Sequence, residues 1–256
     1  QEDLERARSL LDNGVDLIVI DTAHGHSAKV LNVLSKIKKI SIKTPICVGN
    51  IATGEAAKKL YNFGADIIKV GIGPGSICTT RMVAGIGVPQ ISAIMEVKKE
   101  LKKKKVKIIS DGGIKFSGDI AKALAAGADA IMMGSIFAGT DESPGKKYKF
   151  KGKFYKKYRG MGSIGAMSSG SANRYFQKNF KDKSKFVPEG VEGRVEYKGN
   201  ISKIIYQLKG GLRSSMGYIG AKNLGEITKK AKFIKITKAG FYESMVHSVE
   251  MTQKTI

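Results

Sequence analysis

Short apolar runs alternate with longer amphipathic segments through the first 140 residues of the chain. The short runs are rich in Val, Ile and Ala without polar alternation, which is typical of parallel strands covered on both faces. We predict strands over residues 15–21, 45–50, 65–71, 106–113 and 128–135. We predict helices between them over residues 27–40, 54–64, 90–104 and 117–127. This regular order favours a parallel α/β fold.

Three helix–strand junctions share one pattern, a glycine followed two positions later by an aspartate. Gly14, Gly64 and Gly127 each stand where a predicted helix ends. This position favours glycine because the residue there adopts a positive φ. We therefore expect left-handed backbone at all three glycines.

Polar residues and glycines gather where the predicted strands end, at Asp21, Gly49, Asn50, Gly71, Asp111, Gly112, Gly113, Gly134 and Ser135. A (β/α)8 TIM barrel places its active site at this edge, so we predict that fold. A doubly wound sheet is the alternative, since it also binds ligands at the carboxyl ends of its strands. Five strands cannot close an eight-stranded barrel, so we expect further strands before Gln1.

Residues 141–200 break the alternation. They are rich in Gly, Ser and Lys and show little sustained apolar periodicity. A long stretch of this kind inside a compact domain is usually functional or disordered. We predict a mobile flap that closes over a ligand, followed by a helix over residues 201–216.

The chain is strongly basic, with a formal net charge of +23 from 45 Lys and Arg against 22 Asp and Glu. Lysine runs over residues 98–105 and 146–153 carry much of this charge. A nucleic-acid-binding surface is one interpretation. Solvated helix faces are favoured instead, because the runs contain few arginines and only scattered aromatic rings for stacking. Charge of this sign would still attract anionic nucleotides.

The chain has two cysteines, Cys47 and Cys78, which argues against a disulfide scaffold and for a reducing, cytoplasmic setting. The sequence has no apolar run near the roughly 20 residues of a membrane helix, so we expect no membrane association. We place Cys47 in the core, within a predicted strand. Cys78 instead follows a glycine-rich loop at the end of a strand.

The loop before Cys78 holds Gly71, Gly73 and Gly75, so its backbone can close tightly around a ligand. A cysteine exposed among backbone N–H groups can become nucleophilic. The alternative is a small, inert buried thiol. The glycine spacing does not fit a dinucleotide-binding Gly-x-Gly-x-x-Gly turn, so we reject a Rossmann interpretation.

Seven separated segments together resemble the inosine 5′-monophosphate dehydrogenase family in its bacterial form. They are residues 21–27, 49–50, 71–81, 110–113, 133–135, 158–163 and 173–176. The resemblance covers nearly all of residues 1–256 and implies a catalytic TIM-barrel domain, with residues 141–200 as the flap after its last strand. The five predicted strands would be the fourth to the eighth of the barrel. The family's first three strands and its regulatory CBS modules have no counterpart in this sequence.

The resemblance implies oxidation of inosine monophosphate to xanthosine monophosphate by NAD+ and water. Cys78 would attack C2 of the purine and form a covalent thioimidate, which water then hydrolyses. Arg174 would act as the base for hydrolysis, assisted by Thr80 and Tyr175. Thr80 with Glu189 offers a second proton route.

The resemblance also implies a set of nucleotide ligands. The phosphate would be bound by Ser76, Gly113, Gly134, Ser135 and Tyr158. The purine would meet Gly160, Met161, Gly162 and Glu189. The ribose would bind Asp111, for which a helix N-cap is the alternative role.

The implied NAD site consists of Asp21, Ala23, His24, Asn50 and Gly71, with Ser214 and Tyr218 of a neighbouring subunit. We assign His24 and His26 to the lining of this pocket, because two histidines without a third ligand make a poor metal site. The implied potassium site combines the carbonyls of Gly73, Gly75 and Cys78 with Glu243, Ser244 and Met245 of the next subunit. Shared sites of this kind imply a homotetramer.

Guanosine monophosphate reductase is the nearest alternative, because it shares the barrel, the cysteine and the threonine. The pair Arg174 and Tyr175 favours the dehydrogenase. A flavin-binding barrel would give a yellow protein, and a nucleic-acid-binding barrel would bind in a salt-dependent manner without turnover. The complete set of reactive side chains argues against an inactive scaffold.

Overall fold

Five parallel strands form the central sheet in chain order, and the structure, a computed structural model, describes residues 2–179 and 182–250. The strands are β1 (Ile18–Asp21), β2 (Ile46–Ile51), β3 (Ile67–Val70), β4 (Lys107–Asp111) and β5 (Ala130–Met132). This sequential order is that of consecutive βα units in a barrel. It rules out the reversing strand order of a doubly wound sheet. All five predicted strands are confirmed. β2 has the predicted length and is shifted by one residue, and the other four are shorter than predicted.

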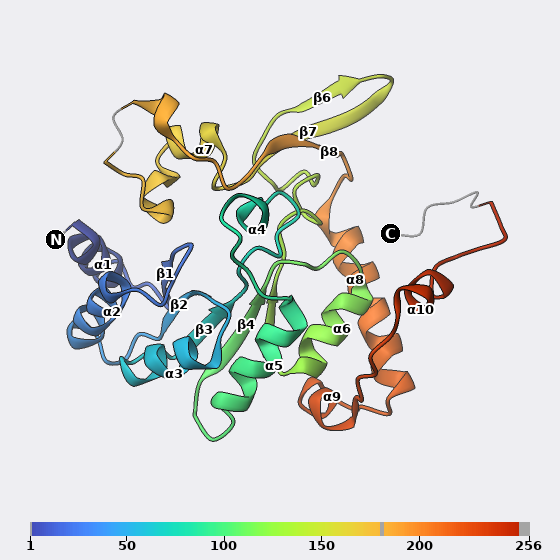
Figure 1. Ribbon diagram of the computed structural model, residues 1–256, viewed down its shortest axis with the longest axis horizontal. Helices are drawn as coiled ribbons and strands as arrows, with labels where there is room; N and C mark the ends of the chain where they lie inside the picture. Colours follow the sequence, from blue (N-terminus) through green and yellow to red (C-terminus); the bar gives the residue numbers. More distant parts are fainter. Residues whose placement is uncertain (1, 180–181, 251–256) are drawn as a thin grey trace.

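Helices cover one face of this sheet (Figure 1). Those that cover it are α2 (Ala28–Ile40), α3 (Gly54–Asn62), α5 (Gln90–Glu100) and α6 (Ser117–Ala126), whereas α4 (Thr80–Val83) lies above the ends of the strands, on the side of the flap. The others are α1 (Glu2–Asp12), α7 (Ile164–Ser168), α8 (Ile201–Tyr218), α9 (Leu224–Lys230), α10 (Lys238–Glu243) and the 3-10 helices η1 (Ser171–Tyr175) and η2 (Lys183–Lys185). Among the described residues, no helix is both long and apolar enough to cross a membrane.

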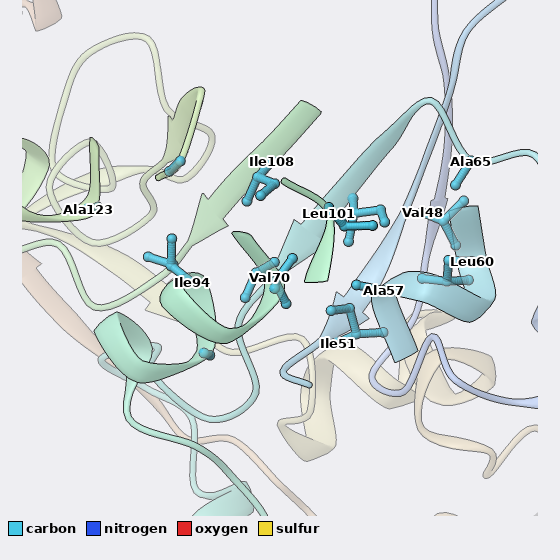
Figure 2. Close-up of a cluster of buried hydrophobic side chains, with 14 of the residues drawn as sticks. Val48, Ile51, Ala57, Leu60, Ala65, Val70, Ile94, Leu101, Ile108 and Ala123 are labelled. Atoms are coloured by element: carbon cyan, nitrogen blue, oxygen red, sulfur yellow. The ribbon is translucent and has the colours of Figure 1, made fainter. Parts of the chain in front are cut away.

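The core lies between the sheet and these helices (Figure 2). Val48, Val70 and Ile108 project from three neighbouring strands and are almost fully buried. They pack with Leu60 of α3 and Ile94 of α5. Cys47 is also buried, as predicted. Close packing of this kind fixes the strands, so the residues at their carboxyl ends are held by a rigid framework.

The three junction glycines have the backbone that the sequence predicts, with φ values of 74° at Gly14, 100° at Gly64 and 116° at Gly127. The aspartate after a junction then ties neighbouring strands together. Asp66 Oδ2 accepts a hydrogen bond of 2.9 Å from the N–H of Ile46, where β2 begins. These contacts help to set the register between adjacent strands.

Regular structure fills part of the segment 141–200, which the sequence had not indicated. A three-stranded antiparallel sheet contains β6 (Lys147–Phe150), β7 (Lys153–Arg159) and β8 (Glu192–Glu196). Lysines and aromatic residues alternate along residues 147–150, which is a strand pattern. The sequence analysis interprets these lysines as part of a solvated charged run, and the structure places them in β6. The sheet and α7 lie above the carboxyl ends of β1–β5 (Figure 1), and we call residues 141–200 the flap.

Candidate active site

A cavity of about 400 Å³ lies between the carboxyl ends of the strands and the flap. Its volume suits a small organic ligand. The predicted site residues that line it are Ala23, Asn50, Gly71, Gly73, Gly75, Cys78, Thr80, Asp111, Tyr158, Gly160, Met161, Gly162, Arg174, Tyr175 and Glu189. Residues far apart in the sequence therefore meet at the edge that the fold predicts for a site.

Cys78, Thr80 and Glu189 form a hydrogen-bonded chain within this cavity. The Cys78 thiol donates to Thr80 Oγ1 at 3.2 Å, and the Thr80 hydroxyl donates to Glu189 Oε2 at 2.7 Å. A proton can therefore move from the sulfur side towards a carboxylate over two short contacts. The thiol is partly buried and lines the cavity, so it does not belong to the buried core.

Main-chain hydrogen bonds attach the Cys78 loop to the flap. The N–H of Thr79 donates to the carbonyl of Glu189 at 2.9 Å, and the N–H of Val191 donates to the carbonyl of Ile77 at 3.0 Å. Cys78 thereby forms an antiparallel bridge with Gly190. The position of Glu189 relative to the thiol is fixed by the backbone on both sides.

Asp21, at the end of β1, holds the flap residue Arg174 through an ion pair of 2.6 Å. Burial favours the neutral form of Asp21, but the charges and hydrogen bonds of Arg174 and Lys69 outweigh it and lower the pKa of this carboxyl. Burial favours neutral Arg174 too, but Asp21 outweighs it and raises the pKa of the guanidinium. A role for Arg174 as a base therefore requires its release from Asp21.

Tyr175 lies against Gly162, within residues 160–162, which the sequence analysis assigns to the purine. A Cβ atom placed on Gly162 would lie 2.9 Å from the Tyr175 ring, so this contact requires glycine at position 162. Burial raises the pKa of the Tyr175 phenol, and the neighbouring charge of Arg174 opposes that rise only in part. Tyr175 is therefore a neutral hydrogen-bonding group at neutral pH.

Lys69, which the sequence analysis did not select, does not line the cavity but pairs with two of the predicted site residues. This lysine of β3 is 2% exposed, and its Nζ lies 2.9 Å from Asp21 Oδ1 and 2.6 Å from Asp111 Oδ2. Asn50 also donates to Asp111 Oδ2, at 3.0 Å. The signal was a single charged residue within the apolar strand β3. The helix-capping alternative for Asp111 is excluded, because α6 begins only at Ser117.

The predicted phosphate ligands are only partly gathered. Gly134 is adjacent to Tyr158, since a Cβ atom on Gly134 would lie 3.0 Å from the Tyr158 hydroxyl. Gly113 is next to Pro74 of the cysteine loop, at 3.4 Å by the same measure. Ser76, Gly113, Gly134 and Ser135 do not line the 400 Å³ cavity, and Gly134 lines a separate cavity together with Tyr158.

The predicted NAD residues are divided among neighbouring cavities. Asn50 lines the main cavity, and its buried Oδ1 has no hydrogen-bond partner among the described residues. His24 and His26 line an adjacent cavity of about 310 Å³. Within the described ranges, no three His, Cys, Asp or Glu side chains are grouped to hold a metal ion.

The residues assigned to a neighbouring subunit lie outside the site of their own chain. Ser214 and Tyr218 are exposed on α8, and Glu243, Ser244 and Met245 are exposed at the end of α10. Figure 1 shows α10 well separated from α4 and the Cys78 loop. Within one chain, these residues do not reach the cavity.

Comparison with known proteins agrees with this geometry. Residues 1–247 match the family model described as the IMP dehydrogenase / GMP reductase domain. Relatives named inosine-5′-monophosphate dehydrogenase include those of Aquifex aeolicus, 55% identical over 99% of this chain, and Staphylococcus saprophyticus, 56% identical over 98%. The matched region is 51% of each relative.

A solved structure with the same fold is a cysteine-to-alanine variant of GMP reductase from Trypanosoma brucei, in complex with guanosine 5′-monophosphate. It is 44% identical with a TM-score of 0.89, over 98% of this chain and 51% of the other. The similarity supports the assignment of β1–β5 to a TIM-barrel sheet. The chain spans about half the length of the relatives that it matches. It belongs to the IMP dehydrogenase / GMP reductase domain family.

Proposed function

We propose that this chain carries the catalytic site of an NAD-dependent dehydrogenase that oxidises inosine monophosphate to xanthosine monophosphate, a step in guanine nucleotide synthesis. The observation that carries the proposal is the chain Cys78–Thr80–Glu189 in a ligand-sized cavity that also contains Arg174 and Tyr175. The names of the bacterial relatives support the same reaction.

In this proposal, the nucleotide binds across the carboxyl ends of the strands. Tyr158 and the backbone at Gly134 take the phosphate, with Ser76, Gly113 and Ser135 completing its ligands. Asp111 accepts the ribose hydroxyls. The purine lies against Gly160, Met161 and Gly162, with C2 towards Cys78. The adjacency of Gly134 to Tyr158 supports this orientation.

The Cys78 thiol releases its proton as the S–C2 bond forms, and C2 gives up its hydrogen as a hydride. Water then adds to C2, the S–C2 bond breaks, and the sulfur regains its proton. Hydrolysis also requires removal of a proton from the water. Thr80 with Glu189 is the route whose hydrogen bonds are already formed, and Arg174 becomes available only when Asp21 releases it.

NAD+, when bound, accepts the hydride. Asp21, Ala23, His24, Asn50 and Gly71 would hold it, with Ser214 and Tyr218 supplied by a neighbouring subunit. The unpartnered Oδ1 of Asn50 fits this role, because a carboxamide N–H group is a suitable donor to it. Arg174 pairs with Asp21 Oδ2, but the Asp21 side chain is 47% exposed, so a ligand can reach this carboxylate beside the flap.

Potassium is the proposed metal cofactor. The carbonyls of Gly73, Gly75 and Cys78 would supply half of its ligands, since carbonyl oxygens suit such an ion. Glu243, Ser244 and Met245 would supply the rest from the next subunit, because they do not reach the loop of their own chain (Figure 1). This arrangement makes the active assembly a homotetramer, and we propose a cytoplasmic location for it.

The second candidate is guanosine monophosphate reduction, because the similar solved structure from Trypanosoma brucei is named a GMP reductase. The pair Arg174 and Tyr175 inside the cavity favours the dehydrogenase, because only the oxidation requires water to be activated for hydrolysis.

The test is absorbance at the NADH band after the full expressed protein is mixed with inosine monophosphate, NAD+ and potassium. A rise that is absent from Cys78→Ala is the expected result. A folded protein that gives no rise, but consumes NADPH with guanosine monophosphate, would establish the reductase.

A further inference from the structure

Lys69 is the most deeply buried charged side chain in the candidate site, with 2% of its surface exposed. A buried ammonium group persists only when its charge is compensated by nearby acceptors. Lys69 has two carboxylate partners, Asp21 on β1 and Asp111 on β4, at 2.9 Å and 2.6 Å. One cation on β3 therefore joins carboxylates from β1 and β4.

The register of β1, β2 and β3 leaves room for the Lys69 side chain to extend across the sheet. Gly49 pairs with Asp21 on one side and with Lys69 on the other. A Cβ atom on Gly49 would lie 2.7 Å from the Cβ of Lys69. Because Gly49 has no side chain, the Lys69 stem has room to cross β2 and reach Asp21.

The charges alternate along a continuous line from the flap to the nucleotide side of the cavity. Arg174 contacts Asp21, Asp21 contacts Lys69, and Lys69 contacts Asp111. Without Lys69, the two carboxylates would face each other in a partly buried space, and their repulsion would push them apart or protonate one of them. When Arg174 leaves Asp21, Lys69 is the cation that still holds this carboxylate in place.

We propose that Lys69 is a positioning residue, which sets the separation and orientation of Asp21 and Asp111 and so couples the cofactor side of the site to the nucleotide side. The proposal rests on the proposed function, in which Asp21 serves NAD and Asp111 serves the ribose. Lys69 itself touches neither ligand in this scheme. Its effect is transmitted through the two carboxylates.

The test compares Lys69→Met and Lys69→Arg with wild type in the full expressed protein. Lys38→Met is the matched control, because Lys38 pairs with Asp66 at 2.7 Å, just before β3 and at the opposite end of that strand. Steady-state kinetics give kcat and both KM values. Calorimetric titration with inosine monophosphate, in a Cys78→Ala background, measures binding without turnover.

We expect Lys69→Met to weaken nucleotide binding and lower kcat/KM about 100-fold, as loss of one member of a buried charge pair does. Lys69→Arg should restore both to within about tenfold, since it keeps the charge on a different head group. Lys38→Met should leave both KM values unchanged. Equal nucleotide binding in Lys69→Met and wild type, with only a lower melting temperature, would overturn the proposal.

A double-mutant cycle separates this proposal from the proposed function. The melting temperature is measured for Lys69→Met, for Asp21→Asn with Asp111→Asn, and for the triple variant. If wild type does not turn over inosine monophosphate, the proposed function fails and the cycle alone decides the role of Lys69. A smaller loss of stability from Lys69→Met in the Asn background supports charge positioning, and an equal loss contradicts it.

Discussion

The hydroxyl of Thr80 stands between a thiol and a carboxylate, and the proposed chemistry depends on this one contact pair. It accepts from Cys78 and donates to Glu189, so the three groups share one direction of proton movement. Cys78 lies in the loop that leads into α4, Thr80 is the first residue of α4, and Glu189 comes from the flap. The order of these groups could not be predicted from spacing, because the flap contact is made through tertiary structure.

Glu189→Gln should lower kcat about 10- to 100-fold, because it removes the acceptor at the end of the proton route. The first turnover should still release NADH, so a burst should precede a slow steady state. Stopped-flow absorbance measures both phases. Glu192→Gln is the control, since Glu192 lies on the flap and accepts from the N–H of Gly165, outside the route. An unchanged kcat in Glu189→Gln would remove this carboxylate from the mechanism.

The ion pair between Asp21 and Arg174 should be independent of pH over the neutral range. The pKa of Asp21 is lowered in the folded protein from an ordinary value of 3.8, so the stabilisation is fully present above that value. It is lost only as the pH falls through the lower folded-state pKa. Hydrogen exchange of residues 171–177, corrected for intrinsic rates, should stay constant from about pH 8 to 5.

Asp21→Asn should raise the exchange of the same segment at all pH values in that range, because the neutral amide holds Arg174 less strongly. Acceleration in wild type between those pH values would show that a different group controls the flap.

At the scale of elements, the sequence predicted the βα units well and the flap poorly. The strands and helices have strong periodic patterns, and Gly14, Gly64 and Gly127 mark where helices end. The sheet of β6–β8 was missed because its alternating residues are lysines and aromatic rings, which pack on one another. Lys147 Nζ, for example, lies 4.3 Å from the centre of the Phe154 ring. Such pairs stabilise a strand without an apolar face.

The contacts of Lys69 were also beyond prediction, for a different reason. The residue itself is visible in the sequence, but its partners follow from the register of β1, β3 and β4. Register depends on how the strands pair in the folded sheet. Recognition of the Cys78 loop therefore located the cavity, while the charged line beneath it emerged only from the structure.

Gly127→Ala should destabilise the protein more than Gly14→Ala does. Both glycines have a positive φ, which costs a non-glycine residue about 1 kcal/mol. A Cβ at Gly14 meets nothing within 4 Å, whereas one at Gly127 would lie 2.9 Å from the Cβ of Lys98 on α5. Thermal unfolding of the two variants should show a loss for Gly127→Ala of roughly twice that for Gly14→Ala. Equal losses would mean that α5 moves freely at this contact.

At the scale of the whole molecule, the net charge of +23 should act on the rate of encounter with the nucleotide. A dianionic substrate is drawn to a basic protein, and salt screens this attraction beyond a Debye length of about 10 Å at 0.1 M. We expect kcat/KM for inosine monophosphate to fall severalfold as choline chloride is raised at constant potassium, with kcat nearly unchanged. A kcat/KM that does not respond to salt would show that the net charge does not affect substrate encounter and would leave it a role in solubility.

The backbone pairing between the Cys78 loop and the flap has a consequence for how this site tolerates sequence drift over evolution. Hydrogen bonds from Thr79 and Val191 use main-chain atoms, so they do not depend on which side chains these positions carry. The neighbouring Gly190 is different, because a Cβ there would lie 3.3 Å from the carbonyl of Ile77 and from the Gly162 backbone. Substitutions other than proline, which has no N–H to donate, should therefore accumulate freely at positions 79 and 191. Position 190 should accept them only where the neighbouring backbone shifts by a few tenths of an ångström, although its residue has no chemistry of its own.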